Sequence, residues 1–153
     1  MWQYNYTDEL YHFGVKGMKW GVRRYQNKDG SLTAAGKKKL KKYENKLDLV
    51  NEHIFKDRLT ARNVRRNDPA SSLVLPVLSE RVKKYSVSGK RIVETMKKKR
   101  LISNSTTFDE YTSKYEKKVI NDCKKYVKEK YNMKNVTDDD ANYFLEAYIF
   151  GDI

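Results

Sequence analysis

The chain has 153 residues, a formal net charge of +13, and 39% hydrophobic and 35% charged residues. This composition fits one domain with a thin, aromatic-rich core between helices and excludes a large sheet core. The single cysteine, Cys123, excludes an internal disulfide and a multi-cysteine zinc cluster within one chain. The charge favours polyanionic partners, nucleic acid before anionic lipid or an acidic protein surface, and the alternative is a solvated basic helical face.

No targeting segment is expected at the start of the chain. The first residues, MWQYNYTDEL, lack the basic and apolar regions of a signal peptide. No window approaches the roughly 18 consecutive apolar residues of a membrane span, so no span is expected. With one cysteine, the simplest compartment is a reducing one.

Charge divides the chain into three zones. The net charge is +2 over residues 1–36, +15 over residues 37–131 and −4 over residues 132–153. The division predicts a Gly/aromatic docking module over residues 1–36. It also predicts a basic helical domain over residues 37–153 that ends in a short acidic helix.

The N-terminal zone contains a dense block, HFGVKGMKWGVRRYQ, at residues 12–26. Its three glycines fall within eight residues and weaken a helix by about 1 kcal/mol each, which predicts a shaped loop or hairpin. An aromatic anchor beside arginines is typical of a docking interface, although Trp20 could equally cover the glycines as core. The candidate docking residues are His12, Trp20, Arg23, Arg24 and Tyr25.

A turn follows this block. Residues 22–26 alternate like a short strand, and Asn27-Lys28-Asp29-Gly30 is a turn signal, because Asp-Gly tolerates positive φ. Ser31-Leu32 could then pair back on the strand. Thr33 is predicted to cap the helix that comes next.

A long helix is predicted after Thr33. An apolar stripe recurs at steps of three and four at Leu40, Tyr43, Leu47, Val50 and Ile54. The pattern fades at residues 67–69, where a proline restricts the residue before it. The apolar run at residues 73–78 is interrupted by Pro76 and is interpreted as a buried turn or a kinked helix start.

Residues 79–101 carry Val82, Tyr85, Ile92, Val93 and Met96 and are interrupted by Ser86-Val87-Ser88-Gly89. This pattern is typical of a loose helix-turn-helix. Lys90 and Arg91 would open its second helix, where base contacts fall in DNA-reading motifs.

Two further helices are predicted. Thr107 can cap one whose apolar face contains Phe108, Tyr111, Tyr115, Val119, Cys123 and Tyr126. Thr137, followed by three aspartates, opens a last short helix whose apolar side contains Tyr143, Phe144, Ala147 and Tyr148. The predicted fold is therefore mainly α: a small Gly/aromatic hairpin-like module followed by a bundle or extended array of four to five helices.

Clusters of basic residues are the candidate phosphate contacts, and their alternative is a solvated face. Arginine adds bidentate phosphate donors to the lysine runs. The candidates are Lys37, Lys38, Lys39, Arg62, Arg65, Arg66, Lys97, Lys98, Lys99 and Arg100.

No catalytic or metal motif is present. The sequence lacks GxSxG, Walker A, GxGxxG and HExxH patterns, and His12 lies far from His53. Cys123 falls in an apolar stripe and is interpreted as a small buried hydrophobe. We therefore expect no enzyme, no cofactor and no metal.

Residues 12–40 resemble a module near the ends of many tailed-bacteriophage virion proteins of Gram-positive hosts. That module has the form H-x-G-x-x-G-x-K-W-G-V-R-R-[YF]-Q-N-x-D-G-S-L-T-x-x-G-x-x-R-[YW]. The chain departs from it where Lys39-Leu40 replace the terminal Arg-aromatic positions, and where Ala34 or Ala35 replaces a frequent proline. The matching positions are His12, Gly14, Gly17, Lys19, Trp20, Gly21, Val22, Arg23, Arg24, Tyr25, Gln26, Asn27, Asp29, Gly30, Ser31, Leu32, Thr33 and Gly36.

The resemblance implies a phage structural protein, namely a minor head protein or an internal core or ejected protein. Its module would dock onto capsid, portal or core protein, and its basic helices would meet packaged double-stranded DNA nonspecifically or the inner shell. It would reside in the virion and, during assembly, in the host cytoplasm. Two alternatives remain: a scaffolding or assembly factor that self-associates through its narrow apolar stripes, and a phage DNA-binding regulator that uses residues 79–101.

Overall fold

The computed structural model describes residues 24–27, 29–67 and 71–150. Within these residues the fold is mainly α, as predicted, and contains four helices and no strand. The helices are α1 (Ala34–Asn67), α2 (Ser71–Lys98), α3 (Phe108–Tyr131) and α4 (Asp138–Phe150). None of the described helices combines the length and the apolar character that a membrane crossing requires.

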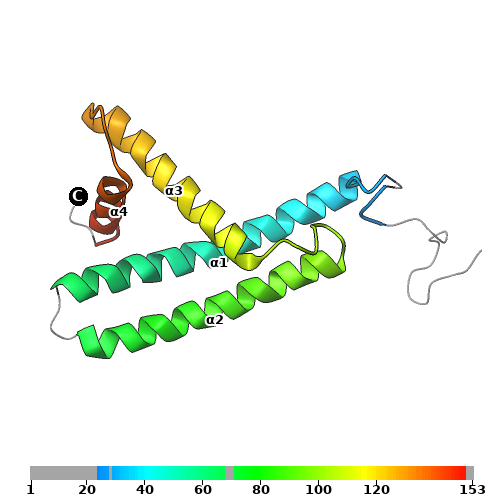
Figure 1. Ribbon diagram of the computed structural model, residues 1–153, viewed down its shortest axis with the longest axis horizontal. Coiled ribbons are helices and arrows are strands. Elements are labelled where there is room, and N and C mark those ends of the chain that lie inside the picture. Colours follow the sequence, from blue (N-terminus) through cyan, green and yellow to red (C-terminus); the bar gives the residue numbers. More distant parts are fainter. Residues whose placement is uncertain (1–23, 28, 68–70, 151–153) are drawn as a thin grey trace, which may run out of the picture.

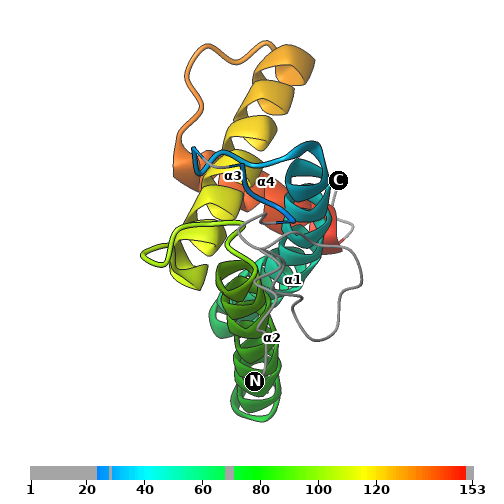
Figure 2. The same cartoon turned by 90° about the vertical axis from the view of Figure 1, so that its right-hand side faces the viewer.

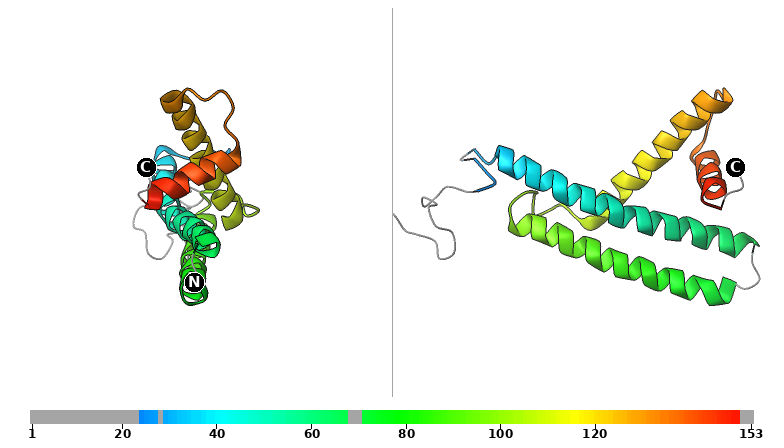
Figure 3. Two further views of the ribbon diagram at one scale, coloured as in Figure 1. Left: turned by 90° about the vertical axis from the view of Figure 1, so that its left-hand side faces the viewer. Right: turned by 180° about the vertical axis from the view of Figure 1, so that it is seen from behind.

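The long helices α1 and α2 lie side by side in Figures 1 and 2, and Figure 1 shows that they run antiparallel. Helix α3 begins beside the middle of this pair and leaves it at an angle, and α4 turns back beside the second half of α1 (Figure 3). The start of α1 therefore lies beside the end of α2. This arrangement positions the candidate site.

The core lies between α1 and α2 and is closed by the start of α3. The predicted stripe of α1 is confirmed, since Leu47 and Ile54 are buried and Leu40, Tyr43 and Val50 pack beside them. Burying a side chain of this size stabilises the fold by about 1.5–3 kcal/mol. The buried core cluster consists of Leu47, Ile54, Val93, Met96, Leu101 and Phe108.

Polar side chains begin the helices, as predicted. The Gly36 N–H donates to Thr33 Oγ1 over 3.1 Å at the start of α1, so the helix begins inside the module that was expected to end at residue 36. Thr107 and Glu110 form a reciprocal capping box on α3. Thr137 and Asp140 form the same pair on α4, and the hydrogen bonds from the Thr137 hydroxyl and backbone N–H lower the pKa of Asp140.

The predicted helix-turn-helix at residues 79–101 is wrong. Helix α2 continues through Ser86-Val87-Ser88-Gly89 to Lys98. Gly89 is buried against the Phe108 ring, which a Cβ at this position would overlap. Burying Phe108 offsets the roughly 1 kcal/mol by which glycine weakens a helix, so the glycine marks a close helix contact and not a turn.

Of the two interpretations of residues 73–78, the buried turn is wrong and the helix start is confirmed, because these residues form part of the first turns of α2. Leu73 is 75% exposed and Val77 57% exposed, whereas Leu78 is buried. Pro76 costs the helix one backbone hydrogen bond near its N-terminal end, where the loss is tolerated more easily than farther along. Leu73 and Val77 therefore lie on the surface.

The predicted apolar side of α4 is wrong at two positions. Tyr143 and Tyr148 are 66% and 76% exposed, and α4 instead buries Ala141 and Glu146. The face of this short helix is set by its two neighbours, because α4 packs against both α3 and α1. On α3, Tyr126 of the predicted stripe is likewise exposed.

Candidate polyanion interface

The antiparallel pairing brings two lysine clusters to one end of the molecule. One cluster follows the first turn of α1 and the other lies in and after the last turn of α2. Cations near a helix C-terminus favour the helix dipole, but cations just after a helix start do not, so helix stability does not account for the α1 cluster. We call this region the basic end; it comprises Lys37, Lys38, Lys39, Lys97, Lys98, Lys99 and Arg100.

Tyr43 joins the two clusters. The Lys99 ammonium donates to the Tyr43 hydroxyl over 2.8 Å. The ammonium groups of Lys99 and Lys39 lie 5.4 and 5.5 Å from the centroid of the same ring, within cation–π range. The hydrogen bond from Lys99, followed by the charges of Lys99, Lys39 and Lys46, lowers the pKa of Tyr43. Sequence analysis assigned Tyr43 to the core stripe and gave no signal for this role, because Lys99 is 56 residues away in the chain.

The cations of the basic end differ in exposure. Lys37, Lys38, Lys98 and Arg100 are exposed, and no carboxylate among the described residues pairs with them. Lys97 is half-buried and its ammonium lies 2.9 Å from Glu94 Oε1. The first four are therefore available to an external anion.

The described part of the module packs on this end. Gln26 and Leu32 form an isolated antiparallel bridge, which confirms the predicted pairing at this one position. The Thr33 N–H donates to the Tyr25 carbonyl over 3.0 Å, and Gly36 leaves room for that carbonyl, which a Cβ would overlap. The module is thus continuous with the start of α1.

The turn itself has the predicted chemistry. Gly30 has a φ of 85°, which glycine adopts without steric cost. Asp29 Oδ1 accepts hydrogen bonds from the Ser31 hydroxyl and the Ser31 N–H, which lower the pKa of Asp29. The hairpin-like module as a whole extends beyond the described residues.

Of the predicted docking residues, Arg24 and Tyr25 are described. The Arg24 guanidinium lies 5.6 Å from the Tyr25 ring centroid, and Arg24 is exposed while Tyr25 is half-buried against the core. His12, Trp20 and Arg23 lie outside the described residues. Their docking role stays a prediction.

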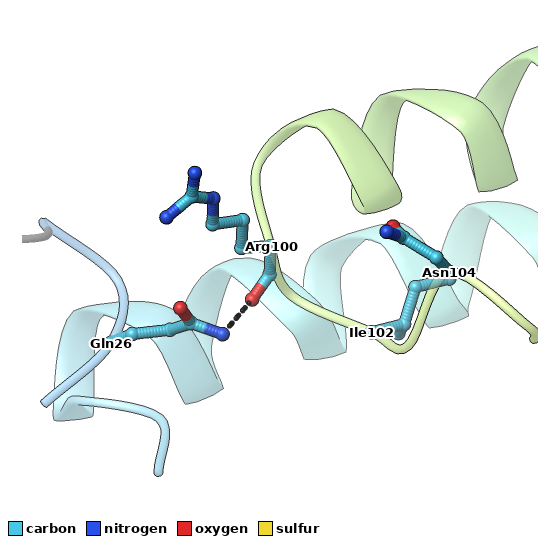
Figure 4. Close-up of a pocket in the computed structure, with 4 residues that line it drawn as sticks. All are labelled: Gln26, Arg100, Ile102 and Asn104. Atoms are coloured by element: carbon cyan, nitrogen blue, oxygen red, sulfur yellow. Dashed lines mark hydrogen bonds between the residues drawn. The ribbon is translucent and has the colours of Figure 1, made fainter. Parts of the chain in front are cut away.

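A side chain of the module also reaches the loop after α2. Gln26 Nε2 donates to the Arg100 carbonyl over 2.7 Å (Figure 4). This contact borders an open hollow of about 410 Å³ lined by Gln26, Arg100, Ile102 and Asn104. Sequence analysis had no signal for a binding role of Asn104, which lies in the loop after α2.

The other predicted phosphate contacts lie in the opposite half of α1. Arg62 Nη1 is 4.0 Å from Glu146 Oε1 on α4, Arg58 pairs with Glu116 on α3, and Arg81 Nη2 is 3.1 Å from Asp57 Oδ1. We call the region of these three ion pairs the ion-paired end; it comprises Asp57, Arg58, Arg62, Arg81, Glu116 and Glu146. Arg65 lines a groove beside them, and the side chain of Arg66 lies outside the description. The structure therefore does not bring Arg62 and Arg65 to the basic end, and Arg62 faces a carboxylate of its own chain.

Sequence analysis missed the buried polar residues. Asn51, Asp57 and Glu146 are almost fully buried, and Asn51 Oδ1 accepts from the Thr112 hydroxyl over 3.0 Å, which ties α3 to α1. Asn51 lies four residues after Leu47 and three before Ile54, so helical spacing alone could have placed it on the buried face.

Of the residues considered for catalysis or metal binding, His53 and Cys123 are described, and His12 lies outside the described residues. Cys123 is half-buried rather than buried, its thiol donates to the Ala141 carbonyl over 3.5 Å, and burial raises the pKa of the thiol. The His53 ring stacks on Tyr85 with centroids 4.7 Å apart. Across residues 24–27, 29–67 and 71–150, no group of three or more His, Cys, Asp or Glu side chains could hold a metal ion.

Comparison with known proteins concerns the module alone. Residues 4–27 are similar to a family of unknown function (DUF7211). No curated protein and no solved structure matches the chain. The matched segment overlaps the Gly/aromatic block and ends just after Gln26, the residue that contacts the Arg100 carbonyl.

Proposed function

We propose that this chain is a structural protein of a tailed-bacteriophage particle, either a minor head protein or an internal core or ejected protein. Its basic end binds the backbone of packaged double-stranded DNA without reading sequence, and its N-terminal module docks onto capsid, portal or core protein. The role is one of binding and assembly and not of catalysis. It is carried out in the virion and, during assembly, in the host cytoplasm.

The observation that carries the DNA contact is the meeting of Lys39 and Lys99 over the Tyr43 ring. Gathering cations at one end costs repulsion within the chain, and a polyanion that neutralises them relieves this cost. The exposed lysines beside the ring lack carboxylate partners within the described part of the chain, so their charge is directed to solvent. The phage setting is supported by the resemblance of residues 12–40 to virion proteins.

The position of the module supports two contacts made from one end of the molecule. Its described residues are hydrogen-bonded to the start of α1 and to the loop after α2. A virion protein bound by the module would therefore lie next to DNA bound by the lysines. This geometry suits a protein that attaches DNA to a protein surface.

Titration of the full chain with two short DNA duplexes of unrelated sequence tests the DNA contact. We expect equal affinities for both duplexes, with a logarithmic affinity that falls linearly with the logarithm of salt concentration by about 0.9 for each phosphate contacted. Strong preference for one duplex would contradict backbone binding. Absence of binding at low salt would refute the DNA contact altogether.

A scaffolding or assembly factor is the second candidate, and the exposed apolar side chains favour it. Leu73, Val77, Tyr143 and Tyr148 are more than half exposed, as expected of surfaces that another copy or another assembly protein covers. Mass spectrometry of purified mature particles separates the two proposals. Presence of the chain supports the virion protein, and its absence, together with presence in immature particles, supports the scaffold.

A further inference from the structure

Helix α2 ends in a hydrogen-bond pattern that calls for a left-handed residue. The Leu101 N–H donates to the Met96 carbonyl over 3.0 Å and the Arg100 N–H to the Lys97 carbonyl over 2.7 Å. Arg100 accordingly has a φ of 55°. Glycine is the usual residue at this position of such a helix end, because any side chain costs free energy in the left-handed region. The helix end therefore does not explain why arginine stands here.

The backbone of Arg100 is fixed on both sides. Leu101, the next residue, is buried in the core cluster together with Met96. On the other side, the Arg100 carbonyl accepts from Gln26 Nε2 over 2.7 Å. Figure 4 shows this bond and the Arg100 side chain extending away from the loop. The backbone from which the guanidinium extends is thus fixed, and no carboxylate among the described residues pairs with Arg100.

The hollow beside Arg100 has the lining of an anion subsite. Its walls are a guanidinium, the carboxamides of Gln26 and Asn104 and the apolar side chain of Ile102, without a carboxylate. A guanidinium binds two phosphate oxygens in parallel, and a carboxamide N–H donates to a third. The apolar wall suits the carbon face of the adjoining sugar.

We propose that Arg100 and Asn104 bind one phosphodiester group of a DNA backbone, and that Gln26 positions Arg100. This inference rests on the proposed function, and it adds a single defined contact to the diffuse contacts of the lysines. It also explains the arginine in a strained backbone conformation, because the side chain serves binding while its backbone serves the helix end. The contact reads no sequence, since all phosphodiester groups are alike.

The test measures binding of a short duplex of arbitrary sequence to the full chain carrying Arg100→Gly. We expect the affinity at low salt to fall about tenfold and the salt slope to fall by about 0.9, the value of one phosphate contact. The melting temperature should stay or rise, because glycine relieves the strain at Arg100. Arg100→Lys keeps the positive charge but lacks the planar guanidinium that binds two phosphate oxygens at once, so we expect the affinity for DNA to fall by about threefold.

Three further variants keep the test independent of folding. Asn104→Ala alters an exposed loop side chain and should weaken binding by about threefold. Lys84→Ala removes one exposed charge from the middle of α2 and should leave affinity within about twofold. Among the described residues, Asn132 also has a left-handed backbone, with a φ of 54°. Asn132→Gly relieves the backbone strain there and should leave the affinity for DNA unchanged.

The outcomes separate this inference from the function on which it rests. A loss in Arg100→Gly no larger than that in Lys84→Ala, with wild-type binding intact, overturns the phosphate contact and leaves the DNA contact standing. Failure of the wild-type chain to bind duplex defeats both. Equal binding of polyglutamate, lost in the same variants, would instead assign the subsite to an acidic protein surface.

Discussion

At the basic end the cations are mainly lysines gathered near the Tyr43 ring, whereas at the ion-paired end three arginines each face a carboxylate on another helix. The ion-paired end connects α1 to α2, α3 and α4, so its charge is used within the fold. At the basic end, Lys97 alone among the cations has a carboxylate partner in the described part of the chain. A high net charge therefore need not act as one surface, because only the cations without a carboxylate partner are available to a polyanion.

Charge reversal at the basic end should have the largest effect, and this effect should be on the affinity for duplex DNA. The variant Lys37→Glu, Lys38→Glu, Lys98→Glu should lose at least about a hundredfold in affinity for duplex DNA at low salt, because three cationic contacts become repulsive. Fluorescence anisotropy measures the affinity, and circular dichroism checks the helical content. The control Lys83→Glu, Lys84→Glu, Lys125→Glu has the same net charge and should lose far less. Equal losses in both variants would show that net charge alone governs binding.

Breaking an ion pair at the ion-paired end should lower the free energy of unfolding and leave the affinity for DNA unchanged. Arg81→Ala leaves the carboxylate of Asp57 buried without its cation, and we expect a loss of about 2 kcal/mol in the free energy of unfolding, limited by the partial exposure of Arg81. Urea denaturation measures the loss. Adding Asp57→Asn should recover part of it. A weaker affinity for DNA, with stability unchanged, would reverse the assignment of the two ends.

Helix α2 and Phe108 make a close contact at Gly89, and Gly89→Ala tests it. The new methyl group would overlap the Phe108 ring, and overpacking should cost about 1–2 kcal/mol despite the better helix propensity of alanine. Thermal unfolding by circular dichroism measures this cost. Ser88→Ala, an exposed neighbour, is the matched control and should be neutral or slightly stabilising. A stabilised Gly89→Ala variant would mean that Phe108 does not pack against α2 at this position.

The smallest expected effect concerns the ionisation of Tyr43. Its pKa is lowered from the ordinary value of 10.0, first by the hydrogen bond from Lys99, whereas burial raises the pKa of Tyr111 and Tyr115. Because the folded state loses this proton more readily than the unfolded state, Tyr43 adds stability as the pH rises toward 10 and none at neutral pH. A difference titration of tyrosinate absorbance against Tyr43→Phe should show one group that titrates early. Lys99→Gln should move that group back toward its ordinary pKa, and a group that stays in place would remove Lys99 as the cause.

Local chemistry made much of the fold predictable. Thr33, Thr107 and Thr137 each begin a helix where a hydroxyl can accept a backbone N–H, and the stripe around Leu47 and Ile54 follows helical spacing. Where Gly89 was interpreted without its neighbours in space, the prediction failed. Gly89 is explained by Phe108, which lies nineteen residues away in the chain and adjacent in space.

The lysine clusters of the candidate site could be predicted from the sequence, but their arrangement in space could not. The lysine clusters are visible in the sequence, but their meeting depends on the antiparallel pairing of two long helices, which no local pattern specifies. The same pairing gave Arg62 a carboxylate partner on α4, although the sequence presents it as equivalent to the lysines. Arg100 stands out only when its left-handed backbone and its bond to Gln26 are known.

Lysine acetylation footprinting in the presence and absence of duplex DNA locates the DNA contact on the folded full chain. We expect DNA to protect Lys37, Lys38 and Lys98, which are exposed at the basic end, and to leave Lys83, Lys84 and Lys125 as reactive as in the free protein. Uniform protection of all six lysines, or protection confined to the second three, would contradict DNA binding at the basic end.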